Sequence, residues 1–222
     1  MILVGNDIVD LASPFSFRKS RNSKFINRVL TTNEKVVFHS DQVTDTLLWT
    51  YWAAKESAFK VVSKIEPKVS SSPRKYEVSF DSDTKSSTKT GVVDTPVKRV
   101  HFCANSYISC GKEWIHCVSS SKALGLGPDI VYNAIRIDHL YNYHFSCSTK
   151  NESNYVRKIA GKKMAELLSV YAENITFRKN DHVGEQAYPK VYLQDKKTKI
   201  DVSFSHDGRF VAYAFCLNDS FF

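Results

Sequence analysis

The sequence of 222 residues lacks long hydrophobic runs and closely spaced cysteine pairs. No stretch approaches the roughly 18 to 20 apolar residues of a membrane-spanning helix, and the apolar start at residues 1–4 is far too short for a secretory signal. The five cysteines are odd in number and form no CxxC motif, which argues against a disulfide framework and against a zinc site. We therefore expect a protein of the reducing cytoplasm without a membrane anchor.

Acidic residues are outnumbered by basic ones, since 23 Asp and Glu against 31 Lys and Arg give a net charge of +8. Such a field attracts polyanions such as nucleic acid, nucleotide phosphates or an acidic protein, although it also serves solubility alone. No zinc pattern, helix-turn-helix or RNA-binding aromatic strand supports nucleic acid. Hydrophobic residues make up 42% of the chain, enough for a packed core in one domain or in two small similar halves.

The order of predicted elements repeats along the chain. Residues 1–11 read as a strand and residues 46–63 as a strong helix. Residues 134–138 echo the opening strand with its Asp, and residues 154–171 supply a second helix. Further strands are predicted at 76–80, 97–104 and 114–118 in the first part, and at 190–193, 200–205 and 210–217 in the second.

The repeat predicts an α+β fold of two similar β-α-β-β halves related by a pseudo-dyad. The first half would span residues 1–123 and the second residues 129–222, with a Gly- and Pro-containing linker at 124–128. Residues 81–90, rich in Ser, Thr, Lys and Asp, read as a loop. Thr32, followed by an acid in the next turn, reads as a helix cap. Because the halves differ in charge, only one of the two clefts is expected to be chemically equipped.

Two segments combine acids with a lysine in a structured context: residues 5–11 (GNDIVDL) and residues 52–60 (WAAKESAFK). Side chains four apart on a helix share a face, so Glu56 and Lys60 form a favourable pair. Asp7 follows an aliphatic strand, and a carboxylate near a core face needs a partner. Since Mg²⁺ prefers carboxylate oxygens and substrate phosphates, an ion held by Asp7 and Glu56 would supply one.

Each feature also has a plainer explanation. Glu56 and Lys60 could form only a surface salt bridge worth ~0.3 to 0.5 kcal/mol, and Trp52 on the same stripe could be a core residue. His206 could be a hydrogen-bonded histidine at a strand end. Asp10 faces away from Asp7 if the strand continues, and it reads better as a turn or helix cap.

Taken together, the motifs resemble the signature of the 4'-phosphopantetheinyl transferases. The holo-acyl-carrier-protein synthase type of that family has a G-x-D-I strand, an F-x-x-R-x-L-T segment and a W/F-x-x-K-E-x-x-x-K helix. This chain carries them at residues 5–11, 25–31 (FINRVLT) and 52–60. Near its end, residues 202–208 (VSFSHDG) resemble the family's S-x-S-H-D strand. The resemblance spans almost the whole chain in the expected order.

The family comes in two lengths. The small synthases trimerise and place their sites between subunits, whereas the longer surfactin-synthetase-activating type is a monomer of two fused halves. This chain has the length of the fused type and the motif order of the small type. Its residues 154–211 resemble the first half of the fused type, so the halves stand in exchanged order. The resemblance therefore implies a monomer with one site at the interface of its halves.

Two positions depart from the fused type. That type has an acid two residues after its metal-binding Asp, where this chain has Val9, so a water would fill that coordination place. Its usual Gly-Lys-Pro before the Ser-His strand is replaced by residues 188–190 (YPK). Lys190 is only a weak substitute for the phosphate-binding lysine.

The resemblance implies transfer of 4'-phosphopantetheine from coenzyme A to a serine of an apo acyl carrier protein, with Mg²⁺ as cofactor and 3',5'-ADP as product. Asp7 and Glu56 would hold the metal, Glu56 or a water would accept the serine proton, and Lys60 would stabilise the leaving phosphate. The residues implied for coenzyme binding are Arg157, Ser205, His206 and Lys190. Those implied for an acidic carrier protein are Arg18, Lys19, Arg21 and Arg28.

Two other functions are open on the sequence alone. A non-catalytic binder of carrier proteins or nucleic acid could retain the fold, but it has no use for Asp7, Glu56 and Lys60 together. A Mg²⁺-dependent nuclease or phosphatase would need a fuller acidic cluster than two carboxylates.

Overall fold

The computed structural model of the chain describes residues 1–40, 44–81, 87–97, 103–122, 129–138, 149–179 and 188–217. The first half contains β1 (Val4–Asp10), α1 (Ser23–Val29), α2 (Thr32–Ser40), α3 (Asp45–Val62), β2 (Glu77–Phe80), β3 (Thr88–Asp94), β4 (Cys103–Cys110) and β5 (Trp114–Ser120). The second contains β6 (Ile130–Arg136), α4 (Thr149–Leu168), β7 (Ile175–Lys179), β8 (Pro189–Leu193), β9 (Lys196–Asp207) and β10 (Phe210–Cys216). Single 3-10 turns are η1 (Lys19–Arg21), η2 (Pro73–Lys75) and η4 (Ala172–Asn174).

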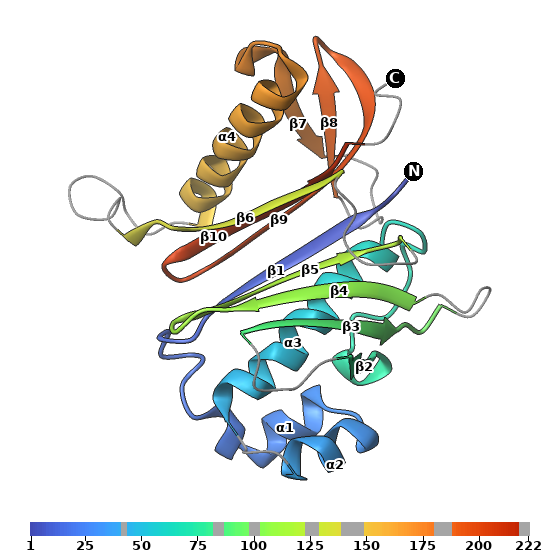
Figure 1. Cartoon of the computed structure of the whole chain (residues 1–222), viewed down its shortest axis with the longest axis vertical. Helices are drawn as coiled ribbons and strands as arrows, with labels where there is room; N and C mark the ends of the chain where they lie inside the picture. Colours follow the sequence, from blue (N-terminus) through green and yellow to red (C-terminus); the bar gives the residue numbers. More distant parts are fainter. Residues whose placement is uncertain are drawn as a thin grey trace.

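Each half folds into one five-stranded antiparallel sheet. The strand orders are β1-β5-β4-β3-β2 and β6-β10-β9-β8-β7, so the first strand of each half pairs with the last. In both halves the long helix follows the first strand, as α3 does in one and α4 in the other (Figure 1). The α+β class and the two similar halves predicted from the sequence are confirmed. The segment predicted as a linker, residues 124–128, lies outside the described residues.

One strand in each half escaped prediction. β3 begins at Thr88, inside the segment that we expected to be a loop, and it alternates buried and exposed side chains between β2 and β4. β7 precedes β8 in the second sheet. Of the strand predicted at 97–104, residues 98–102 lie outside the described residues, and β4 runs from Cys103 to Cys110. The described part of the chain contains no helix long and apolar enough to cross a membrane.

Helix α2 is capped by Thr31 rather than by Thr32. The Thr31 hydroxyl accepts a hydrogen bond from the Glu34 amide at 3.3 Å, and the Glu34 carboxylate accepts one from the Thr31 amide at 2.8 Å. This reciprocal pair satisfies two donors that a helix start leaves free. Glu34 also receives the buried Lys55 ammonium at 2.5 Å, and Lys55 donates to the Val29 carbonyl at the end of α1. Lys55 of the helix motif is therefore a core residue that holds α1 and α2 against α3.

Gly5 brings α3 into direct contact with β1. A Cβ atom at this position would lie 2.0 Å from the Ser57 carbonyl oxygen, so any side chain would push the helix off the strand. Leu48, Ala54 and Ala58 of α3 are fully buried in the core of the first half. The glycine thus fixes how closely the polar side of α3 approaches the residues that follow it in β1.

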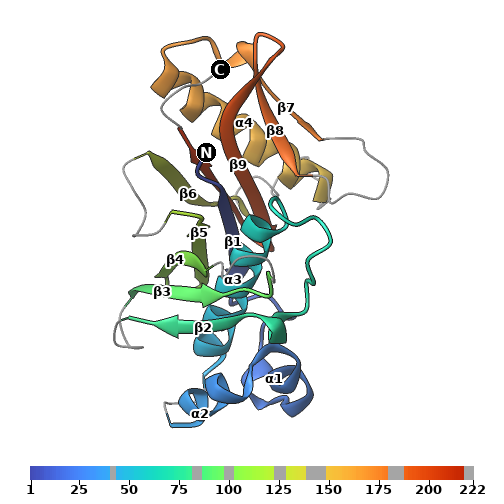
Figure 2. The ribbon, with the colours of Figure 1, turned by 90° about the vertical axis from the view of Figure 1, so that its right-hand side faces the viewer.

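The halves meet where β1 runs alongside β9 (Figure 2). β1 is an edge strand of its own sheet, and its outward amides donate to side chains that project from one face of β9. Each acceptor stands 197 positions after its donor, so the two strands keep one register. Since an open edge strand otherwise leaves its backbone unpaired, this polar ladder completes β1. The pairs are Val4 with Asp201 (2.7 Å), Asn6 with Ser203 (3.0 Å) and Asp10 with Asp207 (2.8 Å).

Candidate functional site

Asp7 and Lys60 form an ion pair between β1 and α3. The Lys60 ammonium lies 2.9 Å from Asp7 Oδ1 and 2.6 Å from the Asn6 carbonyl oxygen. The spacing of the helix had predicted a pair of Lys60 with Glu56, but the close approach at Gly5 lets Lys60 reach β1 instead. The structure thus brings Asp7, Glu56 and Lys60 to one place, with the ion pair made across elements rather than along the helix.

Asp7 and Glu56 are carboxylates that disfavour each other's charge. Burial raises the pKa of Glu56 and the nearby Asp7 carboxylate raises it further, to about 7, although Lys60 and Arg28 oppose the rise. Burial also raises the pKa of Asp7, against the opposing effect of Lys60. Two adjacent half-buried acids of this kind are stabilised by a cation placed between them.

The donor set fits a hard divalent cation with few protein ligands. Carboxylate oxygens are what Mg²⁺ takes from proteins, and it usually keeps several waters. Within the described residues no cluster of three or more His, Cys, Asp and Glu side chains is placed to hold a metal. Val9, which stands two residues after Asp7 where the fused type that the sequence resembles has an acid, is only 4% exposed in the core. A metal here would therefore rest on two carboxylates and on non-protein ligands.

A cleft of about 270 Å³ opens beside this cluster and is lined by both halves. The first half contributes the last turn of α3 and the two residues after it, and the second half contributes α4, the end of β7, the start of β8 and β9. The lining residues are Phe59, Lys60, Ser63, Lys64, Ser153, Arg157, Lys179, Tyr188, Pro189, Val202, Ser203, Phe204 and His206. Residues from two ends of the sequence therefore share one cavity.

Two of the residues expected to bind the coenzyme, Arg157 and His206, face this cleft. The Arg157 guanidinium donates to the Ser153 carbonyl at 2.8 Å and lies 5.2 Å from the centre of the Phe204 ring. His206 Nδ1 lies 3.0 Å from a carboxylate oxygen of the buried Glu152. The charge of His206 also acts on Asp7. The cleft thus carries two cationic or protonatable groups from the second half and Lys60 from the first.

Ser205 does not share the surroundings of His206. Successive side chains of a strand point to opposite faces, and Ser205 is buried on the face of β9 that meets β1. Its hydroxyl accepts a hydrogen bond from the Asn6 side-chain amide at 3.1 Å. Lys190 is not among the residues that line the cleft; its ammonium lies 3.9 Å from the centre of the Tyr188 ring. The coenzyme contacts expected of Ser205 and Lys190 stay predictions.

Sequence reasoning missed Lys64 and Glu152. Lys64 lines the cleft, but its ammonium donates to Asp201 (2.7 Å), to the Val4 carbonyl (2.7 Å) and to the Val202 carbonyl (3.0 Å). All three of its protons are used, so Lys64 joins the halves and is not free to bind a ligand. Glu152 escaped notice because α4 begins at Thr149, five residues before the predicted start.

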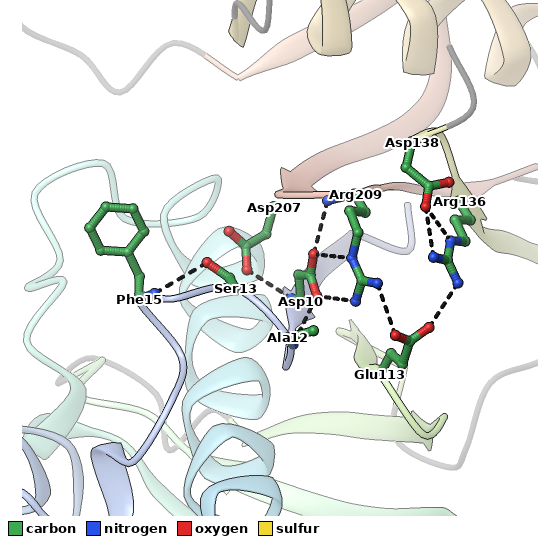
Figure 3. Close-up of polar contacts among 9 residues, drawn as sticks. All are labelled: Asp10, Ala12, Ser13, Phe15, Glu113, Arg136, Asp138, Asp207 and Arg209. Atoms are coloured by element: carbon green, nitrogen blue, oxygen red, sulfur yellow. Dashed lines mark hydrogen bonds and ion pairs between the residues drawn. The ribbon is translucent and has the colours of Figure 1, made fainter. Parts of the chain in front are cut away.

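A chain of ion pairs ties the halves together at one end of β1 (Figure 3). Asp10 accepts from the Ala12 amide at 3.0 Å, which confirms its expected role as a turn cap. Asp10 also accepts two side-chain hydrogen bonds from Arg209, which hold the pKa of Asp10 below its usual value although burial alone would raise it.

The turn before Arg209 requires a glycine. Gly208 has a φ of 50°, and a Cβ atom there would lie 2.5 Å from Asp10. Arg209 bonds Glu113 (2.9 Å), Glu113 bonds Arg136 (2.8 Å), and Arg136 bonds Asp138 (2.7 Å).

The basic residues expected to receive a carrier protein lie on the surface of the first half. Arg18, Arg21 and Arg28 are exposed, and Arg28 is near enough to Glu56 to act on its pKa. Phe15 and Phe17 beside them are 82% and 62% exposed. The first half therefore presents basic and aromatic side chains on its surface, and Arg28 among them is near the acid pair.

Comparison with known proteins gives one finding. A family model described as the 4'-phosphopantetheinyl transferase superfamily matches residues 3–118, which include Asp7, Glu56 and Lys60. Neither a search of curated proteins nor a search of solved structures finds a match. The match covers the acid pair and stops before the second half, which contributes Arg157 and His206 to the cleft.

Proposed function

Since the chain belongs to the 4'-phosphopantetheinyl transferase superfamily and is a transferase of phosphopantetheinyl groups, we propose that it moves 4'-phosphopantetheine from coenzyme A to a serine of an apo acyl carrier protein. One observation carries the proposal. Lys60, which is paired with Asp7 at 2.9 Å, lines the same cleft as His206 and Arg157 of the second half, and the charge of His206 acts on Asp7. A site built from both halves suits a substrate that brings a pyrophosphate on one side and a protein serine on the other.

In this reaction the serine hydroxyl oxygen attacks the β-phosphorus of coenzyme A, and the bond from that phosphorus to the bridging oxygen breaks. The 3',5'-ADP leaves with the bridging oxygen, and the serine proton goes to a base. The candidate base is Glu56 or a water; in the metal-free protein, burial and the Asp7 charge raise the pKa of Glu56 to about 7. Lys60 provides a positive charge beside Asp7 for the leaving phosphate.

Asp7 and Glu56 would hold Mg²⁺. The ion would supply positive charge to the pyrophosphate and to the charge that develops on it. Around that centre, Arg157 and His206 would bind the coenzyme's phosphates from the second half. His206 is held in place by Glu152, whose carboxylate lies 3.0 Å from Nδ1.

The acceptor we propose is an acyl carrier protein or carrier domain with an acidic surface. Arg18, Arg21 and Arg28 would receive it beside the acid pair, in line with steering by opposite charge. Both substrates would then be bound within one chain, so we propose a monomer. A reducing cytoplasm remains the expected setting.

The test is incubation of the protein with coenzyme A, Mg²⁺ and a panel of apo carrier proteins, read by mass spectrometry of the intact carriers. At least one carrier should gain a phosphopantetheine group, and chelation of divalent metal should stop the gain. Binding of a carrier without any mass gain across the panel would instead indicate the non-catalytic binder.

A further inference from the structure

Asn6 lies between the two halves, directly before Asp7, and is fully buried. Its carbonyl oxygen accepts a hydrogen bond from Lys60 at 2.6 Å. Its side chain is enclosed between the halves with no exposed surface, so it is not placed to touch a bound substrate. Asn6 has no part in the transfer chemistry proposed above, so its buried side-chain amide has some other role.

The Asn6 side chain joins three strands. Its Nδ2 atom donates to the Ser205 hydroxyl of β9 at 3.1 Å and lies 3.3 Å from Nε2 of His116 in β5. Its backbone amide donates to the Ser203 hydroxyl at 3.0 Å. One residue of β1 is therefore held by its own sheet on one side and by the second half on the other.

His116 is built to accept rather than to carry charge. It is 3% exposed, and burial with the nearby Lys60 charge lowers its pKa to about 3. A neutral imidazole has one nitrogen that accepts a hydrogen bond. The contact with Asn6 is therefore maintained throughout the neutral pH range.

β9 carries both the contacts with β1 and part of the cleft lining, and Ser203 takes part in both. Ser203 and Ser205 are bonded to Asn6, whereas His206, one position further along, pairs with Glu152 beside the cleft. Because the alternation of a strand is fixed, a shift of β1 along β9 changes the distance between Asp7 and His206. A contact that fixes the register of β1 on β9 therefore also fixes the distance between Asp7 and His206.

We propose that Asn6 is a positioning residue, which clamps β1 to β9 so that Asp7 and Lys60 of the first half stand at a set distance from His206 of the second. This inference rests on the function proposed above. It assigns to Ser205 a role in the same clamp, in place of a contact with the coenzyme. Reactions of positioned groups are sensitive to small displacements, and a shift of about 1 Å can cost on the order of 10²-fold in rate.

The test compares Asn6→Ala and Ser205→Ala with Ser106→Ala as the matched control. Ser106 is also a buried serine, but its hydroxyl bonds Ser119 within the first sheet at 2.7 Å. We expect kcat for transfer to fall about 10- to 100-fold in the first two variants and to stay near wild type in Ser106→Ala. The KM for coenzyme A should hardly change, because Arg157 and His206 are intact.

The double variant Asn6→Ala/Ser205→Ala should lose no more activity than the worse single variant, since both remove the same contact. The inference is overturned if Asn6→Ala keeps a normal kcat. It is also overturned if Ser106→Ala is as slow as Asn6→Ala, which would indicate general loosening of the core. A loss of coenzyme affinity equal to the loss of kcat would place Asn6 in substrate binding and contradict positioning.

A second readout is independent of activity. Hydrogen exchange at the Val4 and Asp10 amides, which bond to β9, should become faster in Asn6→Ala but not in Ser106→Ala. If the wild type transfers nothing to any carrier, the proposed function fails and the exchange rates alone decide whether the clamp exists. Unchanged exchange in Asn6→Ala overturns it.

Discussion

The long helices α3 and α4 hold the same place in their halves but present opposite chemistry to the interface. α3 places Glu56 beside Asp7. Burial and the negative charge of Asp7 together raise the pKa of Glu56. α4 places Glu152 on His206 and sets Arg157 in the cleft, so its acid is already matched with a base. The first half is therefore prepared for a cation and the second for an anion. One fold used twice builds a site only because the copies have diverged in charge.

Among the residues of the second half that the structure describes, no pair of acids corresponds to Asp7 and Glu56. Asp138, which echoed Asp7 in the sequence, lies two residues beyond the end of β6 and is bound to Arg136. It belongs to the chain of ion pairs between the halves, where its charge is already matched. Variants that remove a charge from one half test this difference between the halves. Control variants make the same chemical change at a position outside the site.

The largest effect is expected from the acids of the first half. Asp7→Ala and Glu56→Ala should each reduce transfer at least about 10²- to 10⁴-fold, because each removes a metal ligand and one removes the proposed base. Thermal unfolding should stay close to wild type, because charge is lost rather than core volume. Glu166→Ala on α4, an exposed acid paired with Lys163, is the control and should remain active. Near-normal turnover of Asp7→Ala at low Mg²⁺ would contradict the metal assignment.

Breaking the buried ion pair between the halves should cost the most stability. Lys64 and Asp201 are 3% and 2% exposed, and Lys64→Met would leave the Asp201 carboxylate buried without its cation. We expect the free energy of unfolding in urea to fall by about 3 to 5 kcal/mol. Lys163→Met, which removes an exposed pair, should leave the free energy of unfolding close to that of the wild type. Equal losses in the two variants would show that Lys64 does not hold the halves together.

Binding of divalent cations should weaken as the pH falls through about 7. The pKa of Glu56 is raised from 4.5 to about 7, so below that pH a proton occupies the carboxylate that the cation needs. Calorimetric titration should show the affinity for Mg²⁺ falling up to about tenfold per pH unit below 7 and levelling above it. In the metal-free protein the folded state binds the extra proton between pH 4.5 and 7. Glu56 therefore contributes to the stability of the metal-free protein at low pH, and this contribution is lost as the pH rises through about 7. An affinity that is constant from pH 8 to pH 5.5 would contradict a cation on Glu56.

The smallest effect is expected at the basic surface. Arg21→Glu should raise the KM for the carrier protein several-fold and leave the affinity for coenzyme A nearly unchanged, as high salt should also do, because exposed charges are screened beyond ~8 to 10 Å. Arg178→Glu on β7 makes the same change on the other half and should leave the carrier KM unchanged. If Arg21→Glu lost affinity equally for both substrates, this surface would bind coenzyme A and the carrier-protein assignment would be wrong.

The sequence predicted the class of fold, the two halves and the acids of the first half, because these follow from local periodicity and short motifs. It placed Asp7, Glu56 and Lys60 together, but it paired Lys60 with the wrong acid. The pairing depends on how closely α3 approaches β1 at Gly5, which is a tertiary distance. Likewise, β3 is a strand because β2 and β4 flank it, although its Thr- and Lys-rich sequence is typical of a loop.

The sequence also could not show which residues of β9 contact β1 and which pair with α4. The S-x-S-H-D motif groups Ser205 with His206, yet alternation sends them to opposite faces, and only the packing of β1 shows which face meets what. The contacts of Asn6, Lys64 and Asp201 link residues more than a hundred positions apart. No local pattern marks them.

The central claim is that the acid pair of one half and the cationic residues of the other serve a single site. The most direct test is ³¹P relaxation of coenzyme A bound to the wild-type protein, with Mn²⁺ in place of Mg²⁺. Paramagnetic broadening falls steeply with distance, so Mn²⁺ should broaden the pyrophosphate resonances strongly. Glu56→Gln should remove the effect while coenzyme A stays bound. Sharp pyrophosphate lines from a protein that has bound both Mn²⁺ and coenzyme A would place the two at separate sites and contradict the account.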